Sequence, residues 1–396
     1  MTYPVKWFDS DMAGAPTLDA NAGSLIALLK ACFIDGFNLQ ALDSLTYDSG
    51  SGEVTGTVGN GHGFVKHQVV KIAGADQAEY NGEHRVSWID STTFRYTPAA
   101  APAASPATTS GTLEARAAPV GGWEIAHDDG QGTIAAFRST APEATGILFR
   151  FDDSNTDPDW DSNAADVMVC GAEAMTDIDT YDGAFPSATT RYRIIRKDAS
   201  PTPTAGGIAW ELVADGSACH LVTDPGNDPD NPHRRSAYMF GDLVSYRPGD
   251  AYHAGLVLGD ENTSANYCTS HFGQLGQNNG HYLARSHTQA PGVVQWRGMG
   301  SSLSNHLGHG GLPYPNPADN GLYLHAPVLV KEPDADTLRG EWPGMAQLLQ
   351  TAPLPHRQVL EHVNGEPVLY LALQCGRSRN SSDAGELLVD LVGPWR

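Results

Sequence analysis

Histidine is the residue type in this chain that could most readily perform chemistry, because many of the 15 histidines crowd into the second half. The crowded ones are His271, His281, His287, His306, His309 and His325. His306 and His309 are three residues apart, a spacing that could place two imidazoles on one metal ion. Leu and Gly separate them and two glycines follow, so the pair is predicted in a loop, with no acidic residue at a helical metal-site offset. We interpret these residues as loop histidines and predict no metal ligands.

Two acidic runs could supply oxygen ligands to calcium. The first contains Asp152, Asp153, Asp157, Asp159 and Asp161, and the second spans residues 224–230. An EF-hand loop starting at Asp157 would need Gly at its sixth position and Glu at its twelfth, but the chain has Ser162 and Met168 there. Both runs are interpreted as solvated turns, and the sequence leaves open whether either loop (152–161 or 224–230) binds calcium.

Motifs of nucleophilic and nucleotide-dependent enzymes are missing from the sequence. There is no G-x-S-x-G, no phosphate-binding GxxxxGK[ST], and no G-x-G-x-x-G between a strand and a helix. Glycosidases need only a carboxylate pair, and 46 acidic residues allow many pairs that only geometry could choose between. We therefore assign no catalytic, cofactor-binding or metal-binding residue, predict no cofactor, and predict that the protein is not an enzyme.

Charge and composition restrict the partners and the fold class. Lys plus Arg number 24 against 46 Asp plus Glu, a net charge of −22 that repels nucleic acid and anionic membranes. The 43 glycines and 26 prolines interrupt long helices and indicate a mainly β, turn-rich protein. The five cysteines are far apart and are predicted to be reduced thiols. The most apolar stretch, residues 25–37, is too short to span a membrane, and the first residues do not resemble a signal peptide.

One helix is predicted, between Asn21 and Gly36. Apolar residues follow a helical stripe there, Asn21 could cap the start, and Gly36 could supply a left-handed stop. Before it, residues 1–20 contain apolar side chains without periodicity. We predict residues 1–51 to be an N-terminal helical and attachment segment that ties the chain into an assembly, with burial in its own domain as the better-supported alternative.

Residues 52–119 are predicted to form a small antiparallel β-domain that folds by itself. Its apolar residues alternate in short runs, and Asn81-Gly82 between two such runs is a strong hairpin signal. The tract at 98–111, PAAAPAASPATTSG, lacks side chains large enough for a core and is predicted to be a solvated loop.

Residues 120–396 are predicted to form a larger β-rich domain, sandwich- or barrel-like and possibly divisible near 260–340. Strand-like runs recur there between clusters of Asp, Gly, Asn and Pro. The best helix candidate in this part is Met345–Thr351, one or two turns after Trp342-Pro343-Gly344.

Several stretches together resemble uncharacterised virion structural proteins, tail-associated, of tailed bacteriophages and prophages of proteobacteria. In residues 61–96 they are Gly61-His62-Gly63-Phe64, Val69 to Ala75, Tyr80-Asn81-Gly82, and Thr93 to Tyr96. Further along they are Ala118-Pro119, Gly122-Trp123-Glu124, Phe240-Gly241-Asp242, Pro248-Gly249-Asp250 and the ending Gly393-Pro394-Trp395.

The resemblance implies a non-enzymatic structural subunit of the virion, assembled in the host cytoplasm and placed at the tail tip, baseplate or fibre. Its partners would be other virion proteins and copies of itself in a homo-oligomer, with a host surface receptor as a further possibility. The alternatives are a receptor- or glycan-binding virion protein, a head surface or decoration protein, and a cell-envelope hydrolase.

Overall fold

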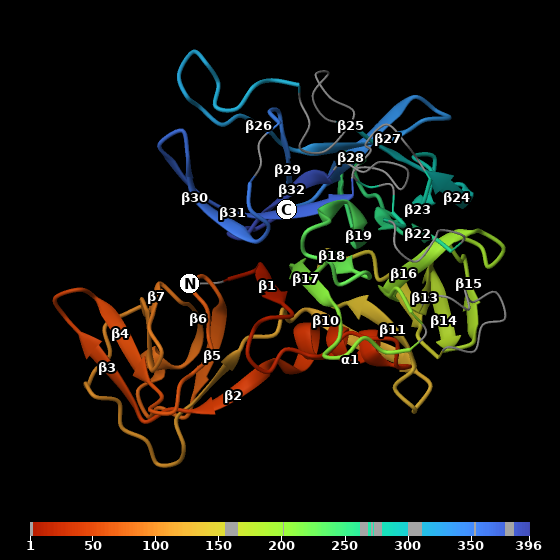
Figure 1. The fold of residues 1–396 in the computed structure, drawn as a ribbon. Coiled ribbons are helices and arrows are strands. Elements are labelled where there is room, and N and C mark those ends of the chain that lie inside the picture. The colour runs from red at the N-terminus through yellow and green to blue at the C-terminus, as the bar shows by residue number, and fades with distance from the viewer. Residues whose placement is uncertain are drawn as a thin grey trace.

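The described part of the chain is mainly β, as the sequence predicts, and its strands pair in antiparallel sheets (Figure 1). The computed structural model describes residues 3–154, 165–200, 202–261, 268–270, 272, 279–299, 311–351, 354–376 and 384–396. Within these residues every strand pair is antiparallel, and one short α-helix lies near the N-terminus. No described helix has the length and apolar character needed to cross a bilayer.

Two sheets enclose the main hydrophobic core. The seven-stranded sheet has the order β1 (Lys6–Asp9), β17 (Ala209–Ala214), β18 (Ala218–Asp224), β19 (Ser236–Asp242), β21 (Ala254–Val257), β23 (His281–Arg285) and β24 (Pro291–Gln295). The six-stranded sheet has the order β10 (Trp123–Asp128), β11 (Ile134–Ser139), β12 (Leu148–Asp152), β13 (Ala165–Ala172), β16 (Tyr192–Asp198) and β22 (Gly259–Asp260). Phe240 of β19 meets Phe149 and Phe151 of β12 at ring distances of 5.6 and 5.1 Å, so aromatic side chains join the two sheets.

The predicted helix exists, but it begins and ends differently. Helix α1 (Ser24–Lys30) continues into a π-helical turn (Ala31–Asp35), and Figure 1 shows it beneath β10 and β11. The prediction that Asn21 caps it is wrong: Gly23 is the N-cap residue and makes no side-chain cap. Instead Asp153, at the end of β12, accepts a hydrogen bond from the Leu25 N–H at 2.9 Å. Gly36 has a positive φ of 74° with an extended ψ of 176°, so it ends the turn without the left-handed helical conformation that was predicted.

Residues 3–20 contribute several apolar side chains to the core. β1 pairs with β17, and the side chains of Val5, Trp7, Phe8 and Met12 are buried. The Phe8 ring lies 5.5 Å from that of Phe37. Burial within the chain, the better-supported alternative, is therefore what the structure has for these four side chains, and the attachment role of residues 1–51 stays a prediction.

Residues 37–119 form two four-stranded sheets, at the lower left of Figure 1. One has the order β2 (Phe37–Ala41), β9 (Glu114–Ala117), β5 (Val69–Ala73) and β6 (Gly82–Arg85). The other has the order β3 (Ser44–Asp48), β4 (Glu53–Thr57), β8 (Thr93–Tyr96) and β7 (Trp88–Ile89). Their shared core includes Leu45, which precedes residue 52. The division of the chain into domains at 51 and 119 stays a prediction.

The hairpin signal and the low-complexity tract of this region behave differently. β5 and β6 do form a hairpin, but Asn81-Gly82 stands at the start of β6, after a 3-10 turn (Ala78–Tyr80), and not in a two-residue turn. The Asn81 side chain closes the connection by donating to the Ala75 carbonyl and accepting from the Ala75 N–H, at 2.8 and 3.1 Å. The tract at 98–111 contains no strand and is mostly exposed, as predicted.

These strand pairings predict how fragments of the region behave. A fragment of residues 37–119 should fold, because it contains all eight strands of both sheets. The fragment 52–119 lacks β2 and β3 and should be much less stable, since it loses one edge of each sheet and buried Leu45. Dispersed amide resonances from 37–119 and a collapsed spectrum from 52–119 are the expected results. A well-folded 52–119 would contradict this account.

Two further sheets lie at the top of Figure 1 and complete the chain. One has the order β20 (Val244–Ser245), β28 (Thr337–Trp342), β27 (Val328–Glu332) and β25 (Arg297–Met299). The other has the order β26 (Leu324–His325), β29 (Met345–Leu348), β32 (Ala384–Asp390), β31 (Glu366–Gly376) and β30 (Gln358–Val363). The helical turn predicted at Met345–Thr351 is wrong, because β29 pairs there with β32 and all four of its residues are buried. Tertiary burial outweighs the local pattern.

Glu386 on β32 gives this part of the protein a predictable pH dependence. Burial raises the pKa of Glu386 to about 7, although the Leu354 N–H donates to the carboxylate at 2.7 Å and opposes the shift. Between the ordinary pKa of 4.5 and about 7 the folded state therefore holds a proton that the unfolded state has released. The free energy of unfolding should fall as pH rises through this window and stay level above it.

Replacing Glu386 by glutamine should remove that dependence. The amide keeps an acceptor for the Leu354 N–H and never ionises, so Glu386→Gln should stabilise the protein at pH 8 by an amount on the order of 2 kcal/mol and have little effect at pH 4.5. Urea denaturation at both pH values measures this. The exposed Glu366→Gln on β31 is the matched control and should change neither value. An equal effect of Glu386→Gln at both pH values would exclude the proposed protonation.

Candidate functional site

A cavity lies on the outer face of the six-stranded sheet. Its volume is about 400 Å³. Small-molecule sites are typically clefts of roughly 300–1,000 Å³ that combine an apolar lining with a few converging polar groups. The residues that line the cavity are Arg150, Asp152, Met168, Val169, Cys170, Tyr181, Ala184, Pro186, Ser187, Ala188 and Arg193.

Three structural elements build this cavity. β12 and β13 supply its floor, where Arg150 is directly opposite Cys170 and Asp152 is opposite Met168. The hairpin of β14 (Ala174–Asp177) and β15 (Thr180–Asp182) forms one wall, and Figure 1 shows it beside β13. Residues 184–188 form the other wall and are fastened to β13 by two hydrogen bonds between the backbones of Gly171 and Phe185.

Arg150 is held in a defined orientation. Its Nε donates to the Ile178 carbonyl at 2.8 Å, and its Nη1 lies 3.2 Å from the Asp152 carboxylate. Its Nη2 lies 3.3 Å from Asp179, whose side chain is 77% exposed. The guanidinium also lies over the Tyr181 ring, 5.7 Å from its centroid. Arg150 is therefore fixed through Nε, and the Nη2 end of its fork contacts the exposed carboxylate of Asp179.

The other polar groups of the cavity are neutral or paired. Burial raises the pKa of Cys170 to about 11, against the opposing influence of Arg150 and a hydrogen bond with Tyr181, so the thiol is protonated at neutral pH. Burial is also the main cause that raises the pKa of Tyr181. Arg193 contacts Glu261 at 3.1 Å. Two guanidinium groups and one carboxylate thus line the cavity, and each guanidinium is paired, Arg150 with Asp152 and Asp179 and Arg193 with Glu261.

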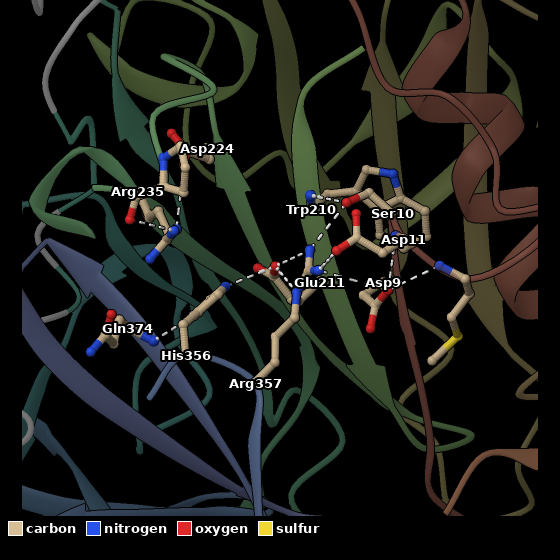
Figure 2. A network of polar contacts seen from close by, with 12 residues as sticks. Asp9, Ser10, Asp11, Trp210, Glu211, Asp224, Arg235, His356, Arg357 and Gln374 are labelled. Carbon is tan, nitrogen blue, oxygen red and sulfur yellow. Dashed lines mark hydrogen bonds and ion pairs between the residues drawn. The ribbon is translucent and has the colours of Figure 1, made fainter. Parts of the chain in front are cut away.

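A second group of polar residues is centred on buried Glu211 and joins three parts of the chain (Figure 2). Glu211 of β17 is almost fully buried and accepts hydrogen bonds from His356 Nε2 at 2.9 Å and Arg357 Nε at 2.7 Å. Arg357 also reaches Ser10 at 3.1 Å and pairs with Asp11 in the segment after β1. Burial alone would raise the pKa of Glu211, but His356 and Arg357 outweigh it and keep the pKa below its usual value.

The histidine of this network is fully engaged. The Gln374 N–H donates to His356 Nδ1 at 3.0 Å, which assigns the proton of the neutral ring to Nε2, where it is donated to Glu211. Both ring nitrogens are thus occupied. We interpret the network as a connection between the N-terminal segment, the central sheet and the C-terminal sheet.

The residues considered from the sequence fall in different places. His271, His306, His309, Asp157, Asp159 and Asp161 lie outside the described residues. Asp153 is buried and paired with Lys197, and in the second acidic run Asp224 pairs with Arg235 at 3.4 Å and Asp228 with Arg234 at 2.9 Å. Within the described ranges no three His, Cys, Asp or Glu side chains group as a metal site would require.

Of the residues that line the cavity, the sequence analysis named only Asp152, as a candidate calcium ligand. Arg150 and Asp152 alternate at the end of a strand, which indicates that they share one face, and this pattern was a usable signal. Nothing in the sequence indicated that the hairpin with Tyr181 would fold over that face.

Comparisons with known proteins add little. No family model matches the chain, and no curated protein matches it. Among solved structures, the Phage phi92 endosialidase is similar over 90% of this chain at 12% sequence identity, with a TM-score of 0.19. The chain spans about half of that protein, 52% of its length. Similarity at this level does not establish a common fold.

Proposed function

We propose that the protein is a structural component of a tailed-phage virion, placed in the tail, with an architectural and non-catalytic role. The resemblance of its sequence to virion proteins of tailed phages supports this proposal. Within the particle the chain would contact copies of itself and other virion proteins, and it would be assembled in the host cytoplasm.

The observation that carries the proposal is the way three parts of the chain are fastened into one body. Lys6 of β1 donates to the Val120 carbonyl at 2.9 Å and pairs with Glu83 of the small β-region at 3.0 Å. Glu361 of β30 contacts Lys66 and His67 of the same region at 2.5 and 2.8 Å. A subunit that transmits force between neighbours needs such fixed geometry.

The polar network of Figure 2 supports an architectural role over a hydrolytic one. A general base needs a free lone pair near the substrate, and both nitrogens of His356 are already engaged within the protein. We therefore expect purified protein to release neither reducing ends from polysaccharide nor muropeptides from peptidoglycan. Release that a single His or Asp substitution abolishes would contradict the non-catalytic role.

Locating the protein in particles tests the structural proposal directly. Gold-labelled antibodies against the chain should bind purified particles at one place on the tail, and a nonsense mutation in its gene should give particles with an incomplete tail. Labelling of heads would favour the alternative of a head surface protein. Absence of the chain from purified particles would refute a virion role.

A further inference from the structure

We propose that the cavity between β12, β13, β15 and residues 184–188 binds an acidic sugar, meaning a pyranose ring that carries a carboxylate. This site is independent of the proposed place in the virion, because it is argued from the chemistry of the cavity alone.

The carboxylate would bind at Arg150. Its guanidinium is oriented by the Ile178 carbonyl, and the exposed Asp179 contact at 3.3 Å is weak enough to be exchanged for a ligand carboxylate. Charge-assisted hydrogen bonds from arginine to a carboxylate are short, strong and directional. Arg193 adds a second guanidinium to the same cavity.

The rest of the cavity suits a polyhydroxylated ring. Asp152 is an acceptor for hydroxyl protons, and the exposed Ser187 hydroxyl can donate or accept. Met168 and Pro186 also line the cavity and offer an apolar surface on which the C–H face of a pyranose can pack. A small inorganic anion would leave this apolar wall and much of the 400 Å³ unfilled. A neutral sugar that displaced Asp179 would leave the Nη2 end of Arg150 without a carboxylate partner.

Titration of the purified full-length chain, followed by ligand-observed NMR, tests the proposal. The probes are D-glucuronate and D-galacturonate, each compared with its neutral parent, D-glucose or D-galactose, and with acetate as a carboxylate without a ring. At least one uronate should bind at least tenfold more tightly than its parent and than acetate. Added salt should weaken this binding. Failure of both uronates to bind at up to roughly 10 mM, or equal binding of acetate, would overturn the proposal.

Two variants and one matched control locate the binding. Arg150→Lys keeps the charge but loses the planar fork, so it should weaken uronate binding at least tenfold. Arg138→Lys is the control, because Arg138 lies on neighbouring β11, pairs with Glu124 and does not line the cavity. Ala184→Leu fills the cavity without changing a charge and should abolish binding, which keeps the test decisive if Arg150→Lys does not fold. Equal effects of Arg138→Lys and Arg150→Lys, or unchanged binding to Ala184→Leu, would show that the uronate binds elsewhere.

Discussion

Deleting residues 1–12 is expected to prevent the chain from folding. The deletion removes edge strand β1 from the seven-stranded sheet together with four buried apolar side chains, Val5, Trp7, Phe8 and Met12. Burial of each such side chain contributes about 1.5–3 kcal/mol, so the loss is comparable to the entire stability of a typical domain, about 5–15 kcal/mol. It also removes Lys6, which fastens the small β-region to the central body.

Circular dichroism and thermal melting of the purified truncated chain measure this effect. Single substitutions show how much of the lost stability comes from buried side chains and how much from removing the segment as a whole. Phe8→Ala should cost about 3–5 kcal/mol of unfolding free energy, whereas Leu39→Ala on β2, at a side chain that is 60% exposed, should change it by less than about 0.5 kcal/mol. A truncated protein that melts at the same temperature but fails to enter particles would contradict this expectation and support the attachment role predicted from the sequence.

The N-terminal segment shows where reasoning from the sequence succeeds and where it stops. The apolar content of residues 1–20 was visible, and so was the helical stripe that became α1. Neither pattern could show that β1 would pair with β17, because that partner lies two hundred residues away. The pairing of strands that are far apart in the sequence is determined by how the complete core packs. In addition, a strand of four residues is too short for its alternation of apolar and polar residues to be recognised in the sequence.

The capping of helix α1 was predicted wrongly for a related reason. Asn21 is a good helix-capping residue by type, yet the carboxylate of Asp153, the residue after β12, accepts the Leu25 N–H instead. Buried Asp153 is itself paired with Lys197, so one tertiary ion pair orients the helix start. The mainly β fold class could be predicted from composition and turn residues. Contacts between residues that are far apart in the sequence, such as Asp153 with Leu25, depend on the complete fold.

The cavity, too, could be predicted from the sequence only in part. Arg150 and Asp152 could be placed on one face of a strand from their spacing alone. That the face is covered by a hairpin from residues 174–182, and walled by residues 184–188, depends on how Ile178 packs against Ala136 and Leu148. The sequence analysis singled out the acidic residues at 152–161. The structure places the cavity around Arg150, which precedes them.

Replacing Glu211 by alanine is expected to lower the free energy of unfolding by about 3 kcal/mol or more. Removing one member of a buried ion pair costs about 3–5 kcal/mol, because the remaining charge keeps its desolvation cost and loses its partner. Arg357 would retain Asp11 and the distant Asp9, which places the expected loss at the lower end of that range. The His356 N–H would lose its acceptor at the same time.

The loss of stability in Glu211→Ala should also be local, confined at first to the strands next to the network. Arg357 and His356 immediately precede β30, so amide hydrogen exchange should accelerate in β30 and in the paired part of β31 before the rest of the chain. Glu124→Ala is the matched control, because Glu124 pairs with Arg138 at the surface, where an ion pair contributes only about 0–1 kcal/mol. If Glu211→Ala costs no more than Glu124→Ala, or if exchange rises evenly across all the sheets, the network of Figure 2 does not fasten the C-terminal sheet to the central one. Glu211→Gln keeps an acceptor for one donor, so its loss should fall between those of the two alanine variants.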